Sequence, residues 1–228
     1  MNSFLNTSKF DTDNKICAVI PFFNEEKTIK DTVNEVLRFV DFVIAVNDGS
    51  SDSSYDKIKN IDKVIILKND FNLGKGKALL KGFTESLKLN SKYTITIDAD
   101  LQHSPKCIPD FIDKIINYDI VIGNRLHDLK NMPLQRRLSN LLTSFLLSKK
   151  TRRNIIDSQC GYRIFKTPVL KNILPESPGF EAESEMIVKA ARNNYKIGFT
   201  DIPVIYGNDD SKMKALQAIK GFLKIMFM

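Results

Sequence analysis

The stretch Tyr93-Thr94-Ile95-Thr96-Ile97-Asp98-Ala99-Asp100-Leu101-Gln102-His103 joins a run of strand-forming residues to two carboxylates. Its first half predicts a buried strand that ends at Asp98. Asp98 and Asp100 would lie close together, where like charges raise each other's pKa unless a cation lies between them. Their oxygens and the amide of Gln102 are hard ligands that suit Mg²⁺ or Mn²⁺. The pattern predicts a divalent-metal site, although Asp-x-Asp on its own also fits an ordinary turn.

Three earlier apolar runs predict strands that also end in polar residues. They cover residues 16–20, 42–46 and 64–67, and segments with helical periodicity separate them. Strands that alternate with helices indicate an α/β fold, with a doubly wound, Rossmann-like and mostly parallel sheet flanked by helices. Ligands bind beyond the carboxyl ends of such strands. We therefore expect Asn24-Glu25, Asp48 and Asp98–Asp100 to line one crevice.

Length and composition favour one intracellular domain. The chain has 228 residues and no internal repeat, so we expect a polar tail over residues 1–14 and one domain over residues 15–228. The three cysteines lack metal-ligand spacing, which indicates reduced thiols in the cytoplasm. Because no apolar run approaches about 18 residues and the N-terminus is polar, we expect neither a transmembrane helix nor a signal peptide.

The positive charge is concentrated in one segment. The formal net charge is +7, and residues 121–170 alone hold ten cations against two anions. Such a segment indicates an anionic partner, which can be a phosphate group, an acidic lipid or a nucleic acid. We expect no nucleic-acid partner, because aromatic residues that would stack on bases do not accompany these cations.

Two segments of the second half predict amphipathic helices. From Leu134 to Lys150, an apolar stripe that includes Leu138, Leu142 and Phe145 lies opposite arginines and small polar residues. This pattern fits an interfacial helix on acidic lipid, and it fits equally a helix that packs on the core. Residues 213–226 repeat the same ambiguity with lysines.

Several motifs resemble those of one enzyme family. In the first half they are Pro21-Phe22-Phe23-Asn24-Glu25, Asn47-Asp48-Gly49-Ser50-Ser51-Asp52, Asn72-Leu73-Gly74-Lys75-Gly76-Lys77-Ala78-Leu79 and Asp98-Ala99-Asp100-Leu101-Gln102-His103. In the second half they are Gly123-Asn124-Arg125, Arg136-Arg137-Leu138-Ser139, Asp157-Ser158-Gln159-Cys160-Gly161-Tyr162-Arg163 and the segment from Phe180 to Met186. The chain resembles family-two inverting glycosyltransferases of the GT-A fold, and more narrowly the dolichyl-phosphate or polyprenyl-phosphate sugar synthases. It departs from them at Phe23, where tyrosine is usual, and at Asn47, where aspartate is usual.

The resemblance implies a role for each set of residues. Residues 15–125 would bind the nucleotide sugar, and residues 126–228 would face the acceptor and the membrane. Donor contacts are implied for Pro21, Phe23, Asn24, Glu25, Asp48, Lys75, Asp98, Ala99 and Asp100. Metal ligands would be Asp98, Asp100 and Gln102. Acceptor-phosphate contacts would come from Arg125, Arg136, Arg137, Ser139, Arg163 and Lys212, and catalytic roles would belong to Asp100, Arg125 and Arg163.

The function implied is transfer of a hexose from a nucleotide-diphosphate sugar to a polyprenyl or dolichyl phosphate. The donor would be GDP-mannose as first choice, or a UDP-hexose, and the protein would be peripheral at the cytoplasmic face of a membrane. One alternative is a sugar or protein hydroxyl acceptor, which needs Asp157, Glu183 or Glu185 as a general base. Another is a scaffold that binds nucleotide sugar or membrane without catalysis. A lipid phosphate needs no base, because its second pKa is near ~6.

Overall fold

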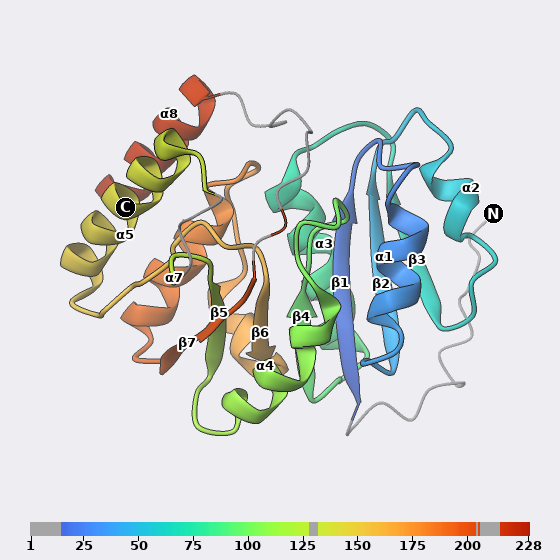
Figure 1. Cartoon of the computed structure of the whole chain (residues 1–228), viewed down its shortest axis with the longest axis horizontal. Helices are drawn as coiled ribbons and strands as arrows, with labels where there is room; N and C mark the ends of the chain where they lie inside the picture. The colour runs from blue at the N-terminus through green and yellow to red at the C-terminus, as the bar shows by residue number, and fades with distance from the viewer. Residues whose placement is uncertain (1–14, 128–131, 204, 206–214) are drawn as a thin grey trace.

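Seven strands form one mixed sheet in the computed structural model, which describes residues 15–127, 132–203, 205 and 215–228 (Figure 1). The strands are β1 (Ile16–Phe22), β2 (Phe42–Asp48), β3 (Val64–Asn69), β4 (Tyr93–Thr96), β5 (Ile120–Asn124), β6 (Arg163–Lys166) and β7 (Ile197–Asp201). Their order across the sheet is β3-β2-β1-β4-β6-β5-β7. The four strands predicted from apolar runs are confirmed as β1 to β4, and so is the α/β class.

Strand direction brings distant segments of the chain to one edge of the sheet. The pairs β1–β2, β2–β3, β1–β4 and β5–β7 are parallel, whereas β6 runs antiparallel to β4 and β5. Thr96 at the end of β4 pairs with Arg163 at the start of β6, and its Oγ1 donates to the carbonyl of Gly161 at 2.7 Å. The segment before β6 therefore reaches the edge at which β4 ends in Asp98.

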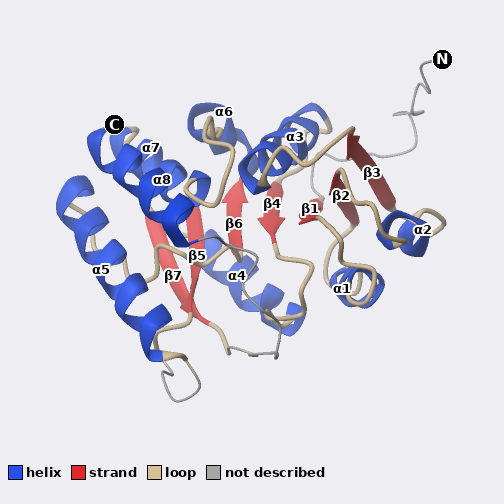
Figure 2. Cartoon of the chain, turned by 90° about the horizontal axis from the view of Figure 1, so that it is seen from above, coloured by secondary structure: helices blue, strands red, loops and turns tan. Residues whose placement is uncertain are grey.

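Helices cover both faces of the sheet. They are α1 (Ile29–Val36), α2 (Ser54–Ile58), α3 (Lys75–Lys88), α4 (Ile108–Ile115), α5 (Leu134–Thr151), α6 (Leu170–Ile173), α7 (Ala182–Arg192) and α8 (Ala215–Phe227), with short 3-10 turns at Pro105–Cys107 and Thr167–Val169. Figure 2 shows α1, α2 and α4 on one face and α3, α6 and α7 on the other. Helix α5 lies outside these layers, against α7 and α8.

Helix α5 turns its polar side toward the protein. The residues that it buries are Asn140, Ser144 and Leu147. Five of its large apolar side chains are exposed: Leu134, Leu138, Leu141, Leu142 and Phe145. Because exposing a continuous apolar stripe to water is unfavourable, this face marks an interaction surface. Of the two alternatives for this stripe, packing on the core is wrong.

Helix α8 adds exposed apolar side chains beside α5. Ile219, Leu223 and Phe227 are exposed, whereas Ile225 is buried, and the Lys150 ammonium at the end of α5 donates to the Met226 carbonyl at 3.0 Å. Met213, which the sequence grouped with this stripe, lies outside the described residues. Within the part of the chain that the structure describes, no helix combines the length and hydropathy needed to cross a bilayer.

Candidate active site

Two carboxylates follow β4 in a tightly held loop. The buried Ala99 between Asp98 and Asp100 accepts a hydrogen bond on its carbonyl from Thr32 Oγ1 at 3.1 Å. Asp100 Oδ1 accepts the backbone N–H of Gln102 at 3.0 Å. Leu101 adopts a φ of +59°, a conformation that costs free energy for a residue with a side chain and that is often found at functional sites. The loop therefore holds both carboxylates at the edge of the sheet.

Lys75 lies between two carboxylates at this edge. Its Nζ is 2.6 Å from Asp98 Oδ1 and 2.8 Å from Glu183 Oε1, and all three side chains are largely shielded from water. Lys75 is the first residue of α3, and Glu183 is in the first turn of α7. A Cβ at Gly161 would lie 2.7 Å from Glu183 Oε1, 2.8 Å from Lys75 Nζ and 2.9 Å from Asp98 Oδ2. Any side chain at position 161 would therefore displace at least one of these three charged groups, Lys75, Asp98 and Glu183, which form the triad.

The two carboxylates of the loop differ in acidity. Burial raises the pKa of Asp98, but the charge and hydrogen bond of Lys75, together with the charges of His103 and Arg125, hold that pKa below its ordinary value. For Asp100, burial and then the charge of Asp98 raise the pKa to about 6. Asp100 lacks a compensating cation of its own within the described residues, as expected of a carboxylate that receives one with the substrate.

The donor set fits a hard divalent cation. Asp98 and Asp100 supply carboxylate oxygens, and the partly buried Gln102 supplies an amide two residues further on. No group of three His, Cys, Asp or Glu side chains suited to a metal occurs among the described residues, so a metal ion here would rely on this pair and an amide. Sites with so few protein ligands are usually completed by water and substrate phosphates, as is common for Mg²⁺ and Mn²⁺.

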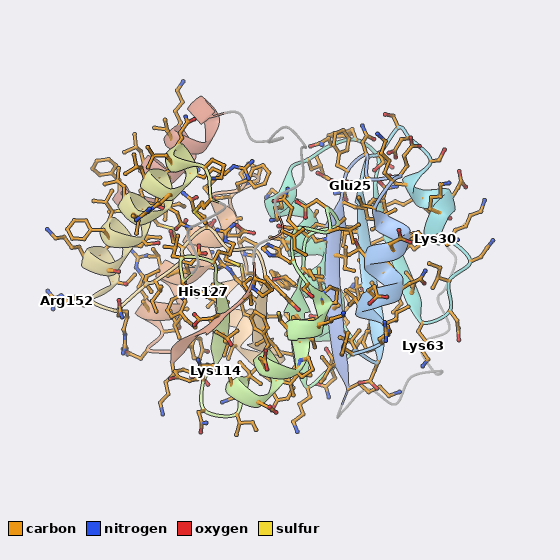
Figure 3. The ribbon with its side chains drawn as sticks, in the orientation of Figure 1. Glu25, Lys30, Lys63, Lys114, His127 and Arg152 are labelled. Atoms are coloured by element: carbon orange, nitrogen blue, oxygen red, sulfur yellow. The ribbon has the colours of Figure 1, made fainter. Side chains whose placement is uncertain are left out.

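The turns after β1 and β2 lock together. Asn24, with a φ of +53°, accepts the Ser51 N–H on its Oδ1 at 2.9 Å, and its own N–H donates to Ser50 Oγ at 3.0 Å. The Glu25 N–H donates to Ser54 Oγ at 2.8 Å. Figure 3 shows Glu25 near the end of β1. These hydrogen bonds therefore hold the segment after β1 against the segment after β2. Pro21 and Phe23, in the first of these segments, are partly exposed.

Asp48 does not face the crevice as expected. Its Oδ1 accepts from Asn69 Nδ2 at 2.8 Å and from the Leu73 N–H at 3.1 Å, and its Oδ2 accepts from the Gly74 N–H at 2.8 Å. Only 4% of Asp48 is exposed. The predicted direct contact with a nucleotide is corrected, since this carboxylate instead fixes the loop that leads into Lys75.

Arg125 forms a bidentate ion pair just after the end of β5. It follows β5, and its Nε and Nη2 donate to Asp157 Oδ2 and Oδ1 at 2.8 and 2.9 Å, while its backbone N–H donates to Oδ2 at 3.1 Å. Asp157 is fully buried, whereas 19% of the Arg125 side chain is exposed. The guanidinium is thus fixed on one side, and its Nη1 is not used by Asp157.

Arg163 is a core residue, which corrects the predicted catalytic and phosphate-binding roles. It is 2% exposed, and its three nitrogens donate to the carbonyls of Cys160, Glu183 and Ser158 at 2.7, 2.8 and 3.0 Å. A guanidinium with its donors directed at backbone oxygens cannot also bind an acceptor in this conformation. Arg163 therefore ties the segment before β6 to the start of α7.

The remaining acceptor candidates lie on α5 or beyond the described residues. Arg136 is exposed and Arg137 partly exposed, both in the first turn of α5. The exposed Ser139 accepts from Gln159 Nε2 at 3.3 Å. Arg152, in contrast, lies at the outer margin of the molecule, far from Glu25 (Figure 3). Lys212 lies outside the described residues, so its role stays a prediction.

The three candidate bases are all engaged. Asp157 is held by Arg125, and although burial raises its pKa, hydrogen bonds and charge from Arg125 hold that pKa below its ordinary value. Glu183 is paired with Lys75. Glu185 is 1% exposed, accepts the N–H groups of residues 176 and 177, and pairs with Lys189 at 2.7 Å, so that its pKa is lowered despite burial.

Residues that the sequence did not single out complete the arrangement. Gly161 makes room for the triad, and the Asn140 amide donates to Asp157 at 2.7 Å. His103 is buried beside Tyr162 with ring centroids 5.5 Å apart, and burial lowers its pKa to about 4. Its Nδ1 has no hydrogen-bond partner among the described atoms.

The sequence is similar to a known protein family and to individual members of known sequence. The family model described as "Glycosyl transferase family 2" matches residues 17–174. The UDP-N-acetylglucosamine–dolichyl-phosphate N-acetylglucosaminyltransferase of Methanococcus voltae is 34% identical over 218 residues, which cover 85% of this chain and 87% of that one. An uncharacterized protein of Methanocaldococcus jannaschii is also 34% identical, over 99% of this chain and 94% of its own.

Solved structures show the same fold at low sequence identity. Glucosyl-3-phosphoglycerate synthase from Mycobacterium tuberculosis in complex with UDP has a TM-score of 0.74 at 17% identity, covering 94% of this chain and 81% of that one. The same enzyme has been solved with Mn²⁺, UDP and phosphoglyceric acid. The predicted GT-A fold is therefore confirmed. The family match and the two relatives together show that this chain belongs to glycosyl transferase family 2.

Proposed function

We propose that the protein is a metal-dependent, inverting glycosyltransferase that moves a sugar from a nucleotide-diphosphate donor to a polyprenyl phosphate. The observation that carries this choice of acceptor is that Asp157, Glu183 and Glu185 are all committed to cations or backbone N–H groups. A hydroxyl acceptor needs a base, whereas a phosphate monoester with a second pKa of ~6 is already ionised at neutral pH. The site offers cations, and its three candidate bases are engaged elsewhere, which favours the phosphate.

The residues suggest how the reaction proceeds. An ionised oxygen of the acceptor phosphate attacks the anomeric carbon, and the bond from that carbon to the donor's β-phosphate oxygen breaks with its electron pair. A divalent cation held by Asp98, Asp100 and Gln102 would neutralise the charge on the departing diphosphate. Lys75 places a second positive charge against Asp98, and Arg125 offers its outer nitrogen to the acceptor. No proton has to move to or from the protein.

The donor proposed is a UDP-sugar, with UDP-N-acetylglucosamine as first choice. Its support is the relative from Methanococcus voltae, which is named for that donor and for dolichyl phosphate. GDP-mannose, preferred from the sequence motifs, gains no support from this relative. Because Mg²⁺ and Mn²⁺ both suit oxygen ligands, either ion is compatible with the site.

The proposed place of action is the cytoplasmic surface of a membrane. Among the side chains that the structure describes, helices α5 and α8 turn eight large apolar ones outward, and α5 also carries cations such as Arg136 and Lys149. Apolar side chains inserted at the headgroup boundary and cations facing anionic lipid are the two contributions to interfacial binding. A lipid acceptor would then present its phosphate at the depth of Arg125 and of the first turn of α5.

The test is transfer of labelled sugar to a short polyprenyl phosphate from UDP-N-acetylglucosamine, UDP-glucose and GDP-mannose, with and without Mg²⁺ or Mn²⁺. Wild type is expected to form a glycolipid only with metal, and Asp100→Ala is expected to lose at least about 100-fold in rate, since it removes charge stabilisation of the leaving group. Asp113→Ala, which removes an exposed carboxylate on α4, is the matched control. A glycolipid formed equally by Asp100→Ala would overturn the proposal.

A further inference from the structure

Asn140 connects the outer helix α5 to the crevice. Its Nδ2 donates to Asp157 Oδ1 at 2.7 Å, and its Oδ1 accepts from Ser144 Oγ at 3.1 Å. These two partners fix which end of the amide faces Asp157. Asn140 is 2% exposed, so its hydrogen bond to a carboxylate is made away from competing water. Such a charge-assisted bond is among the stronger contacts that a neutral side chain can make.

Polar contacts, together with the buried Leu147, attach this part of α5 to the protein. Ser144 Oγ accepts the Ser158 N–H at 3.0 Å, and the hydroxyl oxygens of Thr143 and Ser158 lie 3.0 Å apart. Hydrogen bonds have narrow limits of distance and angle, so they transmit small displacements that an apolar contact would absorb. A change in the tilt of α5 would therefore displace Asp157 and Ser158.

Asp157 passes the position of α5 on to Arg125. The same Oδ1 that accepts from Asn140 also accepts from Arg125 Nη2 at 2.9 Å, and Oδ2 accepts from Arg125 Nε at 2.8 Å. The carboxylate is fully buried, so it has no water to replace a lost partner. The direction of the Arg125 guanidinium thus depends on a carboxylate that α5 helps to hold.

We propose that Asn140 is a positioning residue that couples the seating of α5 on a lipid surface to the placement of Arg125 for the acceptor phosphate. The inference rests on the proposed function, because it takes the apolar face of α5 as lipid-facing and Arg125 as the receiver of the phosphate. The outer face of α5 would contact the lipid, and its inner face, through Asn140 and Asp157, would orient the Arg125 guanidinium. Transfer would be fastest when the acceptor is embedded in a surface on which α5 rests.

The experiment compares two acceptors of the same chemistry. Transfer rates are measured with a polyprenyl phosphate in vesicles of neutral and acidic phospholipid, and with a short water-soluble prenyl phosphate. Wild type, Asn140→Leu and Ser148→Ala are compared, because Ser148 lies on the same buried face of α5 but does not contact Asp157. Binding of the donor nucleotide is measured separately by calorimetry. Asn140→Ala repeats the test with a smaller side chain if leucine lowers the melting temperature.

We expect the Asn140 variants to change the kinetics with respect to the acceptor and to leave donor binding unchanged. Asn140→Leu should raise the KM for the vesicle-bound acceptor about tenfold or more, in line with the loss of a hydrogen bond to a charged group, and leave donor affinity unchanged. Its vesicle-to-soluble rate ratio should fall toward one, whereas Ser148→Ala should keep the wild-type ratio. A wild-type ratio and KM in both Asn140 variants would overturn the inference alone, and so would an equal loss of donor binding. A wild type without lipid-phosphate transfer would overturn the proposed function, and this inference with it.

Discussion

Lys75 Nζ lies 2.8 Å from Glu183 Oε1, and both side chains are almost fully shielded from water. The pair joins the start of α3 to the first turn of α7, two elements that are far apart in the sequence. Burial alone would lower the pKa of Lys75, but the charges of Asp98 and Glu183 outweigh it and raise that pKa. The ammonium is therefore kept charged at the point where a diphosphate is proposed to bind.

Replacing Glu183 should weaken donor binding. In Glu183→Gln, Lys75 keeps a hydrogen-bond acceptor of similar shape but loses one of its two negative neighbours. We expect the donor KM to rise about tenfold, because the ammonium then turns more fully to Asp98 and competes with the cation site. Steady-state kinetics with varied donor checks this. Glu176→Gln is the control, since Glu176 also pairs with a lysine but is exposed. Equal kinetics for both variants would exclude the role given to Glu183.

A methyl group at position 161 should disturb the triad directly. The Cβ of Gly161→Ala would approach Glu183, Lys75 and Asp98 to within 2.9 Å, so at least one of these side chains must move and its ion pair must change. Overpacking of this kind costs about 1–3 kcal/mol, here spent on displacing charged groups. We expect kcat/KM to fall by about 10-fold to 100-fold, with a melting temperature that shifts by only a few degrees at about this cost. Unchanged kcat/KM would contradict the geometry.

Stability should depend on Asp157 in a pH-dependent way. The folded-state pKa of Asp157 lies below its ordinary value, so its ion pair stabilises the protein above the unfolded pKa of about 3.9 and is lost as pH falls through the folded pKa. Asp157→Asn leaves Arg125 buried beside a neutral amide, which should cost about 3–5 kcal/mol near neutral pH. Urea unfolding at a series of pH values should show this difference shrinking below about pH 4. A difference that stays constant or grows in acid would be incompatible with this linkage. Asp56→Asn, at an exposed surface pair, should change little.

The outward apolar face of α5 should govern binding to vesicles. Leu142→Ser together with Phe145→Ser removes two side chains that are 58% and 54% exposed, so folding should be nearly unaffected. Each lost apolar side chain should weaken partitioning into the interface by about 1 kcal/mol or more. Co-sedimentation with vesicles that contain acidic phospholipid measures the loss. Ile116→Ser, at a 66% exposed residue next to α4, should bind like wild type. If it lost as much binding, the surface would have been assigned to the wrong helices.

The parts of the site that could be predicted are those encoded by neighbouring residues. The Asp98-Ala99-Asp100 loop and β1 to β4 follow from local apolar runs and the polar residues that end them. Arg163 and Asp48 were placed wrongly because a motif fixes a residue's position in the chain and not the direction of its side chain. Buried backbone carbonyls took the donors of Arg163, and loop N–H groups took the oxygens of Asp48.

Helix α5 illustrates a second limit. Its alternation of apolar and polar residues predicted an amphipathic helix, but periodicity alone does not say which side faces the protein. The inward side proved to be the polar one, because Asp157 and Ser158 offer partners there to Asn140 and Ser144. Those partners come from the segment before β6, and only the antiparallel pairing of β6 with β4 brings that segment to the site.

The central claim is that the acceptor arrives already ionised, so that no residue of the protein has to act as a base. The most direct measurement is sugar transfer to a polyprenyl phosphate and to the matching polyprenol, each followed from about pH 6 to about pH 9, a range that begins near the second pKa of the phosphate. Transfer to the phosphate alone, with a rate that levels off above about pH 7, is the predicted result. Comparable transfer to the alcohol, or a rate that falls again at high pH with the titration of an enzyme acid, would contradict it.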